Sequence, residues 1–149
     1  MGKTREEIRF AISNNIGQFN IESVGELCIL NEVAIEINKT ATAVFRVNPN
    51  VDAKTHEKIS TGREEDKFGI DIDLIPDVFR HAATLPGIEP VGLAVHIGSQ
   101  LTSLDPFEQA FSRVGLMVKT LRDAGYAVSR LDLGGGLGIV YDEESPPKP

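Results

Sequence analysis

Two stretches of the sequence carry residues that can hold an anion, and each follows an apolar run. His96-Ile97-Gly98-Ser99-Gln100 ends the run that begins at Val91, and Gly134-Gly135-Gly136-Leu137-Gly138 follows a second run. Glycine lets backbone N–H groups approach an anion without a Cβ atom in the way, and a serine can add its hydroxyl. The ends of parallel strands lie at one face of a sheet, where α/β folds bind ligands. The two stretches therefore predict one site, for a phosphorylated ligand.

Each of these residues also has a structural alternative. His96 could be a hydrogen-bonded core histidine, although it could also lie flat against a planar ring or transfer protons near neutral pH. Ser99 could cap a turn, and the three glycines could form a plain flexible turn. They do not form the dinucleotide fingerprint G-x-G-x-x-G, because Ile139 stands where its last glycine would be.

Two cations are further candidates for the site. Arg46 lies within the apolar residues 41–47, where a buried guanidinium needs an anionic or carbonyl partner; this predicts either a ligand or a structural ion pair. Lys67 precedes Phe68 at the end of a polar stretch, where an aromatic ring would anchor the loop beside a cation. The three histidines of the chain have no metal-ligand spacing, so we expect no metal site.

The elements that must position these residues alternate between helical and strand patterns. Capping boxes at residues 4–7 and 23–26 predict the starts of two helices. A third helix is expected after Asp71 or Asp73, and a fourth between Asp105-Pro106 and Gly125. Strands are expected at residues 18–21, 41–47, 91–97 and 129–133, and a long loop at 50–70. This alternation predicts an α/β fold with parallel strands and helical crossovers.

Composition excludes several classes of function. The net charge of −7 argues against a general affinity for nucleic acid or for anionic membrane surfaces. No apolar run approaches the roughly 20 residues of a membrane span, and the first residues lack the apolar centre of a signal peptide. The single cysteine, Cys28, lies in an apolar helix pattern and is expected to be a packed thiol. These features predict a cytoplasmic protein.

Several motifs together resemble the pyridoxal-phosphate-dependent diaminopimelate decarboxylases. They are Arg46-Val47-Asn48-Pro49, residues 55–62, Lys67-Phe68-Gly69-Ile70, His96-Ile97-Gly98-Ser99-Gln100 and Leu131-Asp132-Leu133-Gly134-Gly135-Gly136. The resemblance covers nearly the whole chain and implies an alanine-racemase-like β/α barrel followed by a β domain. Residues 1–149 would form the central part of that barrel, with about four parallel βα units of a (β/α)8 TIM barrel.

The resemblance also implies roles for the candidate residues, with pyridoxal 5'-phosphate as the cofactor. His96 would stack on the cofactor ring, Ser99 and Gly134, Gly135 and Gly136 would hold the phosphate, and Arg46 and Lys67 would lie in the surrounding polar shell. The reaction would be the loss of carbon dioxide from meso-diaminopimelate to give L-lysine, with the cofactor as electron sink.

Other motifs of the family are not found in the chain: a Tyr-x-x-Lys-Ala-Asn-like lysine motif, a Glu-x-Gly-Arg motif and a Cys-Glu-x-x-Asp segment. The resemblance therefore implies a fragment that is inactive alone and an enzyme that is a homodimer when complete. Two alternatives stay open. One is another basic-amino-acid decarboxylase of the same fold, acting on ornithine, arginine or carboxynorspermidine, and the other is a non-catalytic module that binds a phosphorylated ligand or a partner.

Overall fold

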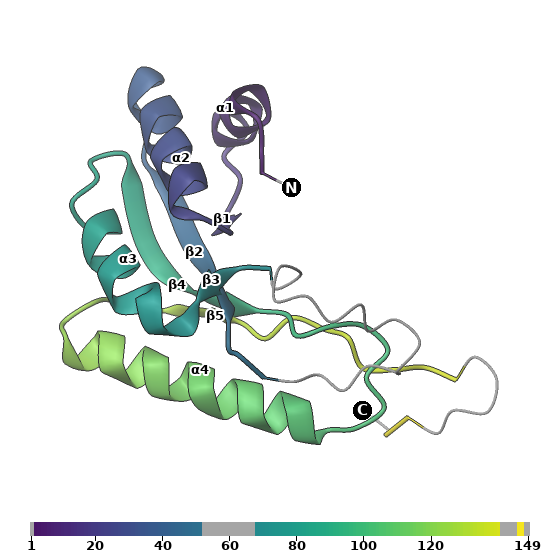
Figure 1. Cartoon of the computed structure of the whole chain (residues 1–149). Coiled ribbons are helices and arrows are strands. Elements are labelled where there is room, and N and C mark those ends of the chain that lie inside the picture. Colours follow the sequence, from purple (N-terminus) through teal and green to yellow (C-terminus); the bar gives the residue numbers. More distant parts are fainter. Residues whose placement is uncertain (1, 52–67, 141–145, 148–149) are drawn as a thin grey trace.

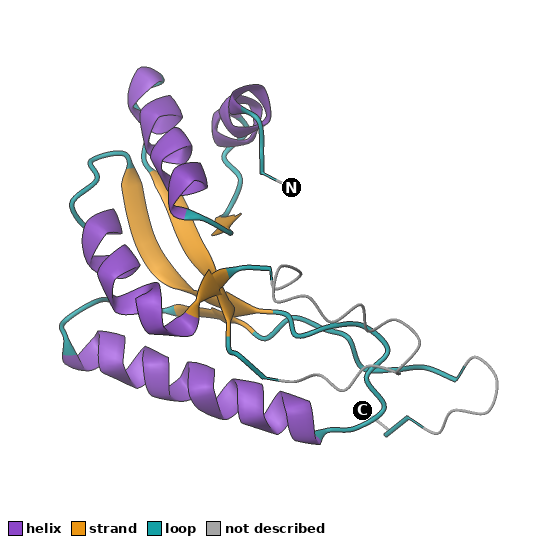
Figure 2. Ribbon diagram, in the orientation of Figure 1, coloured by secondary structure: helices purple, strands orange, loops and turns teal. Residues whose placement is uncertain are grey.

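A curved parallel sheet with helices along its outer side forms the body of the protein. The computed structural model describes residues 2–51, 68–140 and 146–147. Helices α2, α3 and α4 cover one face of the sheet, and the loops that follow β2, β4 and β5 leave it at the same end (Figures 1 and 2). The chain passes through its elements in the following order: α1 (Arg5–Ser13), β1 (Phe19–Ile21), α2 (Val24–Glu36), β2 (Ala41–Asn48), β3 (Ile70–Asp71), the 3-10 turn η2 (Ile72–Leu74), α3 (Ile75–Ala82), β4 (Ile88–Val95), α4 (Asp105–Asp123) and β5 (Arg130–Asp132).

The sheet has the parallel order β1-β2-β4-β5. The expected α/β alternation and the four parallel strands are therefore confirmed. The short strand β3, which pairs with the end of β2, lies at the end of the stretch that was expected to be a loop. β4 begins three residues earlier than expected and ends at Val95, so His96 is the first residue after the strand.

Alternation along the strands gives the sheet two different faces. Ala41, Ala43, Phe45 and Val47 of β2 pack into the main core beneath the helices. We call the opposite side the inner face. It holds a small apolar cluster, Val44, Val91 and Ala94, and polar side chains on each side of that cluster. The register pairs Arg46 with Ala94 and Ala94 with Asp132, so these three residues form one row across the sheet.

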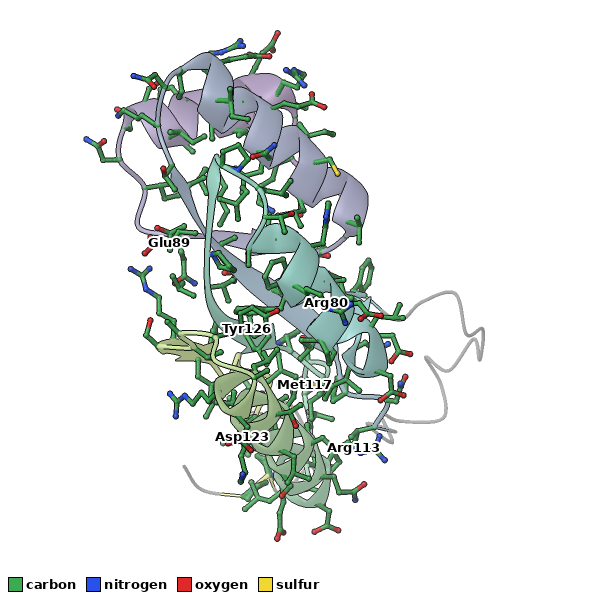
Figure 3. The ribbon with its side chains drawn as sticks, turned by 90° about the vertical axis from the view of Figure 1, so that its left-hand side faces the viewer. Arg80, Glu89, Arg113, Met117, Asp123 and Tyr126 are labelled. Carbon is green, nitrogen blue, oxygen red and sulfur yellow. The ribbon has the colours of Figure 1, made fainter. Side chains whose placement is uncertain are left out.

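The core between sheet and helices contains a line of aromatic rings. The ring of Phe45 lies 5.4 Å from that of Phe79, which lies 5.3 Å from that of Tyr126. Tyr126 and Met117 are half-buried and pack against this core where α3 and α4 meet (Figure 3). The residues expected to face inward on α3 are all buried; they are Ile75, Val78, Phe79 and Ala82.

Two expected helix caps differ in the structure. The box at Thr4 and Glu7 is complete, but at Ser23 only half of the expected box forms. Ser23 Oγ accepts the Glu26 N–H, whereas the Glu26 carboxylate turns toward Lys3 and the Glu22 N–H. Here a tertiary partner displaces the local one.

The helix α4 begins one residue earlier than its sequence suggests. Asp105 was expected to cap it, but Asp105 is already helical and Leu104 occupies the cap position without a side-chain hydrogen bond. Ser103 Oγ accepts the Asp105 N–H and so satisfies a donor of the first turn. Asp71 does act as a cap, though of η2 rather than of α3.

Candidate functional site

The loops that follow β4 and β5 are bonded to each other. The Leu101 N–H donates to the Gly136 carbonyl over 2.9 Å, and the Gly138 N–H donates to the Leu101 carbonyl over 2.9 Å. The Gln100 amide exchanges two hydrogen bonds of 3.1 Å with the Ile139 backbone. The two glycine-bearing stretches of the sequence are thus brought together at the carboxyl ends of neighbouring strands, and they run side by side in Figure 1.

The glycine turn, residues 134–136, packs closely on the exit of β4. Gly134 and Gly136 have φ angles of 69° and 108°. A Cβ atom on Gly134 would lie 2.2 Å from the Val95 carbonyl oxygen, and one on Gly136 would lie 1.9 Å from the Gly98 carbonyl oxygen. Gly135 has neither constraint, because a Cβ atom there would meet nothing within 4 Å. Backbone packing therefore explains two of the three glycines and leaves the third unexplained.

The turn presents N–H groups that the protein does not use. The Gly134 N–H donates to Asp132 Oδ1 over 2.8 Å. The N–H groups of Gly135, Gly136 and Ser99 meet no acceptor among the residues that the structure describes. The φ angle is positive at Gly134 and Gly136 but not at Gly135. Successive N–H groups in alternating backbone conformations are a known arrangement for binding an anion.

His96 lies over this turn. A Cβ atom on Gly136 would be 3.6 Å from His96 Cε1, and one on Gly134 would be 3.3 Å from His96 Cβ. The His96 side chain is exposed, so the alternative of a core histidine is wrong. Ser99 is exposed too, and its hydroxyl caps no turn in the described part of the chain. Both side chains are free to meet a ligand.

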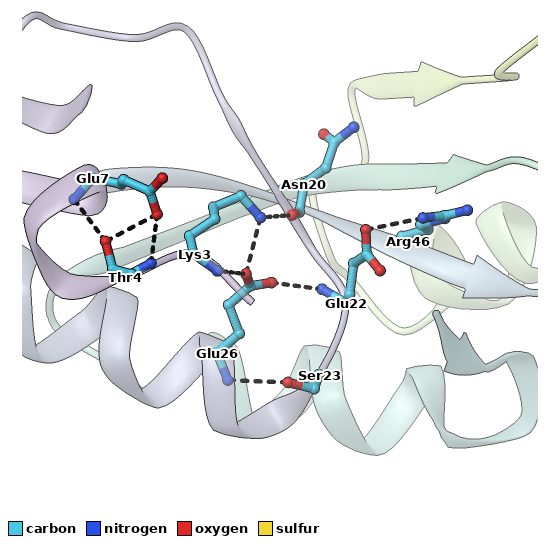
Figure 4. Close-up of polar contacts among 8 residues, drawn as sticks. All are labelled: Lys3, Thr4, Glu7, Asn20, Glu22, Ser23, Glu26 and Arg46. Carbon is cyan, nitrogen blue, oxygen red and sulfur yellow. Dashed lines mark hydrogen bonds and ion pairs between the residues drawn. The ribbon is translucent and has the colours of Figure 1, made fainter. Parts of the chain in front are cut away.

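Arg46 is held by an ion pair and an aromatic ring. Its Nη1 lies 2.9 Å from Glu22 Oε1 at the end of β1, and its guanidinium lies 5.6 Å from the ring centre of Phe68 (Figure 4). A structural ion pair is thus one partner of this half-buried cation. Phe68 does lie beside a cation, although this residue is 63% exposed. The partner in the structure is Arg46, and Lys67 lies outside the described residues.

A second acidic group, Glu26, makes tertiary contacts that the sequence did not predict. It is 5% exposed and accepts hydrogen bonds from the backbone N–H and Nζ of Lys3 and from the Glu22 N–H, at 3.1, 3.0 and 2.9 Å (Figure 4). Burial raises the pKa of Glu26, but these hydrogen bonds outweigh burial and hold the pKa below its ordinary value. Glu26 therefore holds the backbone of Glu22, the residue that pairs with Arg46.

The exit of β2 is also fixed from the outer helices. Arg113 of α4 donates to the carbonyls of Pro49 and Asn50 at 2.8 and 3.3 Å, and it is labelled in Figure 3. The Asn50 amide in turn donates to Asp71 at 3.1 Å. Sequence periodicity could not indicate this contact, because Arg113 is an exposed helix residue whose partners are backbone atoms more than 60 residues earlier.

Neither a metal site nor a membrane-spanning helix is found in the described part of the chain. Within residues 2–51, 68–140 and 146–147, no three potential metal ligands gather into a group. None of the described helices has the length and apolar character needed to cross a membrane.

Comparison with known proteins places this arrangement in a family. The family model for the pyridoxal binding domain of pyridoxal-dependent decarboxylases matches residues 1–149. Diaminopimelate decarboxylase of Haemophilus influenzae is 47% identical over 149 residues, which are 100% of this chain and 36% of that protein. The Pseudomonas aeruginosa enzyme is 48% identical over 147 residues, or 99% of this chain and 35% of the relative. The chain thus spans about a third of the length of these relatives.

Solved structures agree in fold. Diaminopimelate decarboxylase from Helicobacter pylori, complexed with L-lysine, superposes with a TM-score of 0.91 at 38% identity, covering 99% of this chain and 38% of that one. The enzyme from M. jannaschii gives 0.84 at 42% identity, covering 97% and 34%. The expected fold class, a part of a β/α barrel, and the resemblance drawn from the motifs are both confirmed. This chain belongs to the family of pyridoxal-dependent decarboxylases and matches their pyridoxal-binding domain.

Proposed function

We propose that this chain is the part of a diaminopimelate decarboxylase that holds the phosphate and one ring face of pyridoxal 5'-phosphate. The complete enzyme would release carbon dioxide from meso-diaminopimelate and form L-lysine. One observation carries the proposal: the glycine turn presents unused N–H groups directly beside the exposed imidazole of His96. Relatives named diaminopimelate decarboxylase that match the full length of the chain support the choice of substrate.

The chemistry of the donors fits the cofactor phosphate. A phosphate dianion needs several N–H or O–H donors at close range, and Gly135, Gly136 and Ser99 supply them from two adjoining loops. Gly135 is the residue at which a Cβ atom would occupy open space rather than protein, so its lack of a side chain suits a ligand there. When bound, pyridoxal phosphate supplies an electron sink for the carbanion left by decarboxylation.

His96, Arg46 and Lys67 would act around the ring. The imidazole of His96 would pack on one face of the ring and exclude water from it, since a planar side chain offset over a π-system is a favourable contact. Arg46 would keep a positive charge at the inner face near the cofactor, in the orientation set by Glu22. By resemblance, Lys67 would belong to the same polar shell.

The alternative of another basic-amino-acid decarboxylase of the same fold is less well supported. A lysine decarboxylase from Selenomonas ruminantium and a lysine/ornithine decarboxylase from Vibrio vulnificus share the fold at 21% identity each, about half the identity of the diaminopimelate enzymes. We therefore favour a diaminopimelate-type substrate. The complete enzyme would also be a cytoplasmic homodimer with a small amino-acid substrate and no nucleic-acid partner.

A hybrid enzyme tests the proposal. These 149 residues would replace the segment of the Haemophilus influenzae decarboxylase to which they are 47% identical. We expect the hybrid enzyme to bind pyridoxal phosphate, to release carbon dioxide from meso-diaminopimelate, and to restore growth without lysine in a strain lacking its own decarboxylase. A folded hybrid enzyme that binds the cofactor yet decarboxylates only ornithine, arginine or carboxynorspermidine would contradict the proposed substrate. A folded one that binds no cofactor would contradict the site.

A further inference from the structure

We propose that Asp132 is a positioning residue that fixes the glycine turn in its anion-binding form, and that Asn20 of β1 fixes Asp132 in turn. This inference rests on the proposed function, because the anion is taken to be the cofactor phosphate. Asp132 is the last residue of β5 and stands immediately before the turn. Its side chain would act through the backbone and would not itself contact the phosphate.

The first contact is between Asp132 and the turn. Asp132 Oδ1 accepts the N–H of Gly134 over 2.8 Å, a bond in which the side chain holds the backbone two residues ahead. Gly134 then takes a φ of 69°, and the N–H groups of Gly135 and Gly136 meet no acceptor among the described residues. Without Asp132 Oδ1, the Gly134 N–H would lose its acceptor and the turn would lose the bond that selects this conformation.

The second contact crosses the inner face. Asp132 Oδ2 lies 3.4 Å from Nδ2 of Asn20, although β1 and β5 are the first and last strands in the sheet order. The Asn20 amide is itself oriented, because its Oδ1 accepts a hydrogen bond of 2.9 Å from Gln18 Nε2. Gln18 Oε1 accepts in turn from Arg130 Nη1 over 3.2 Å. In Figure 4 the Asn20 side chain points away from helix α2.

These four side chains form a continuous series of hydrogen bonds from Arg130 through Gln18 and Asn20 to Asp132. Both ends of the series lie on β5 and its middle lies on the β1 segment, so the series fixes the curvature of the sheet at the same time as the turn. A carboxylate near a bound phosphate is electrostatically unfavourable. Its presence is therefore explained by the hydrogen bonds it accepts, and a neutral amide of the same shape can keep the one from the Gly134 N–H.

The test separates binding of the phosphate from binding of the ring. In the cofactor-free hybrid enzyme, the affinity of deoxypyridoxine phosphate, which lacks the aldehyde, is compared with that of deoxypyridoxine, which also lacks the phosphate. We expect Asp132→Ala to weaken binding of the phosphate compound about three- to tenfold, as for one lost hydrogen bond, and to leave binding of the other within about twofold. Asp132→Asn keeps an acceptor for the Gly134 N–H but turns an amide donor toward Asn20 Nδ2, so it is expected to weaken binding of the phosphate compound no more than Asn20→Ala does. Asn20→Ala should have an intermediate effect.

Glu89→Ala is the matched control, since it removes a carboxylate at the opposite end of the sheet, beside Thr42 (Figure 3). Amide hydrogen exchange at Gly134, measured also on the 149-residue chain alone, should accelerate in Asp132→Ala and not in Glu89→Ala. Equal weakening of both compounds by Asp132→Ala, or unchanged binding and exchange, overturns the inference. If the unsubstituted hybrid enzyme shows no preference for the phosphate compound, the proposed function itself fails. If that preference is present but insensitive to Asp132→Ala, only the positioning role fails.

Discussion

Glu22 Oε1 and Arg46 Nη1 form an ion pair of 2.9 Å between the end of β1 and the carboxyl-terminal half of β2. Both side chains are partly buried, at 30% and 22% exposed, and the guanidinium also lies 5.6 Å from the ring centre of Phe68. Arg46 therefore has its direction fixed by the protein before any ligand binds. In the function we propose, a cation already in place would cost little reorganisation when the anionic cofactor binds.

Removing Glu22 should destabilise the fold. In Glu22→Ala the half-buried Arg46 loses its anionic partner, and we expect a loss of about 1–2 kcal/mol in the free energy of unfolding. The measurement is urea unfolding of the 149-residue chain. Asp77→Ala, which breaks the solvent-exposed pair between Asp77 and Arg80, serves as the control and should cost less than about 0.5 kcal/mol. Equal effects of the two substitutions would show that the Glu22 pair is merely a surface contact.

The three glycines of the turn should respond differently to alanine. Gly134→Ala and Gly136→Ala force a Cβ atom into backbone oxygens at positive φ and should each cost about 1–3 kcal/mol of stability. Gly135→Ala meets no protein atom and should change stability by less than about 0.5 kcal/mol. In the hybrid enzyme, however, the added Cβ of Gly135→Ala would push the phosphate away from the turn, and cofactor binding should weaken about tenfold or more, as when a charge-assisted hydrogen bond is broken. Unchanged cofactor affinity in a folded Gly135→Ala protein would contradict the assignment of the phosphate to this turn.

Much of this fold was predictable because it depends on local periodicity. Ile75, Val78, Phe79 and Ala82 recur at helical spacing, and all four are buried on one face of α3. The alternation of helical and strand patterns was enough to predict parallel pairing, since crossovers of this length favour it. The neighbourhood of His96 and the glycine turn followed from the same argument, because both stretches follow adjacent strands.

The errors arose where a distant partner outcompetes a local one. Glu26 had the spacing of a capping box, but Lys3, 23 residues away, takes its carboxylate into the core. Asp105 differs for a local reason, because it lies within the first turn of α4 and Ser103 Oγ accepts its N–H. The pairing of Arg46 with Glu22 was one of two open possibilities, and only the register of β1 against β2 decides it. Such contacts depend on tertiary geometry that a single sequence does not encode in its spacing.

His96 should matter for chemistry and not for stability. Its side chain is exposed and makes no hydrogen bond within the described part of the chain. His96→Ala should therefore change the free energy of unfolding by less than about 0.5 kcal/mol. In the hybrid enzyme it should retain most of the cofactor but lower kcat, because one ring face becomes open to water. His81→Ala, on the exposed side of α3, is the control. Normal turnover in a cofactor-loaded His96→Ala enzyme would refute the stacking role.

Glu26 should make the stability of the chain depend on acidity. Its pKa in the folded protein lies below the ordinary value of 4.5, because hydrogen bonds from Glu22 and Lys3 outweigh the opposing effect of burial. As the pH falls, the unfolded chain binds a proton at this position before the folded chain does. The stabilisation from Glu26 is therefore fully present above about pH 4.5 and is lost as the pH falls through the lower, folded-state pKa.

Glu26→Gln should remove this pH-dependent part of the free energy of unfolding. The amide keeps the shape and one acceptor but loses the charge that Lys3 contacts, so we expect a loss of about 1–3 kcal/mol at neutral pH. The difference in unfolding free energy between parent and variant should then shrink steadily below pH 4.5. A residual acid dependence should persist in the variant, since Arg9 and Thr4 hold the pKa values of Glu36 and Glu7 below the ordinary value as well. Urea titrations between neutral pH and pH 3 measure the difference, with Glu89→Gln as control. A difference independent of pH would mean that Glu26 stabilises the fold by packing alone, and that Lys3 holds the segment before α1 without help from its charge.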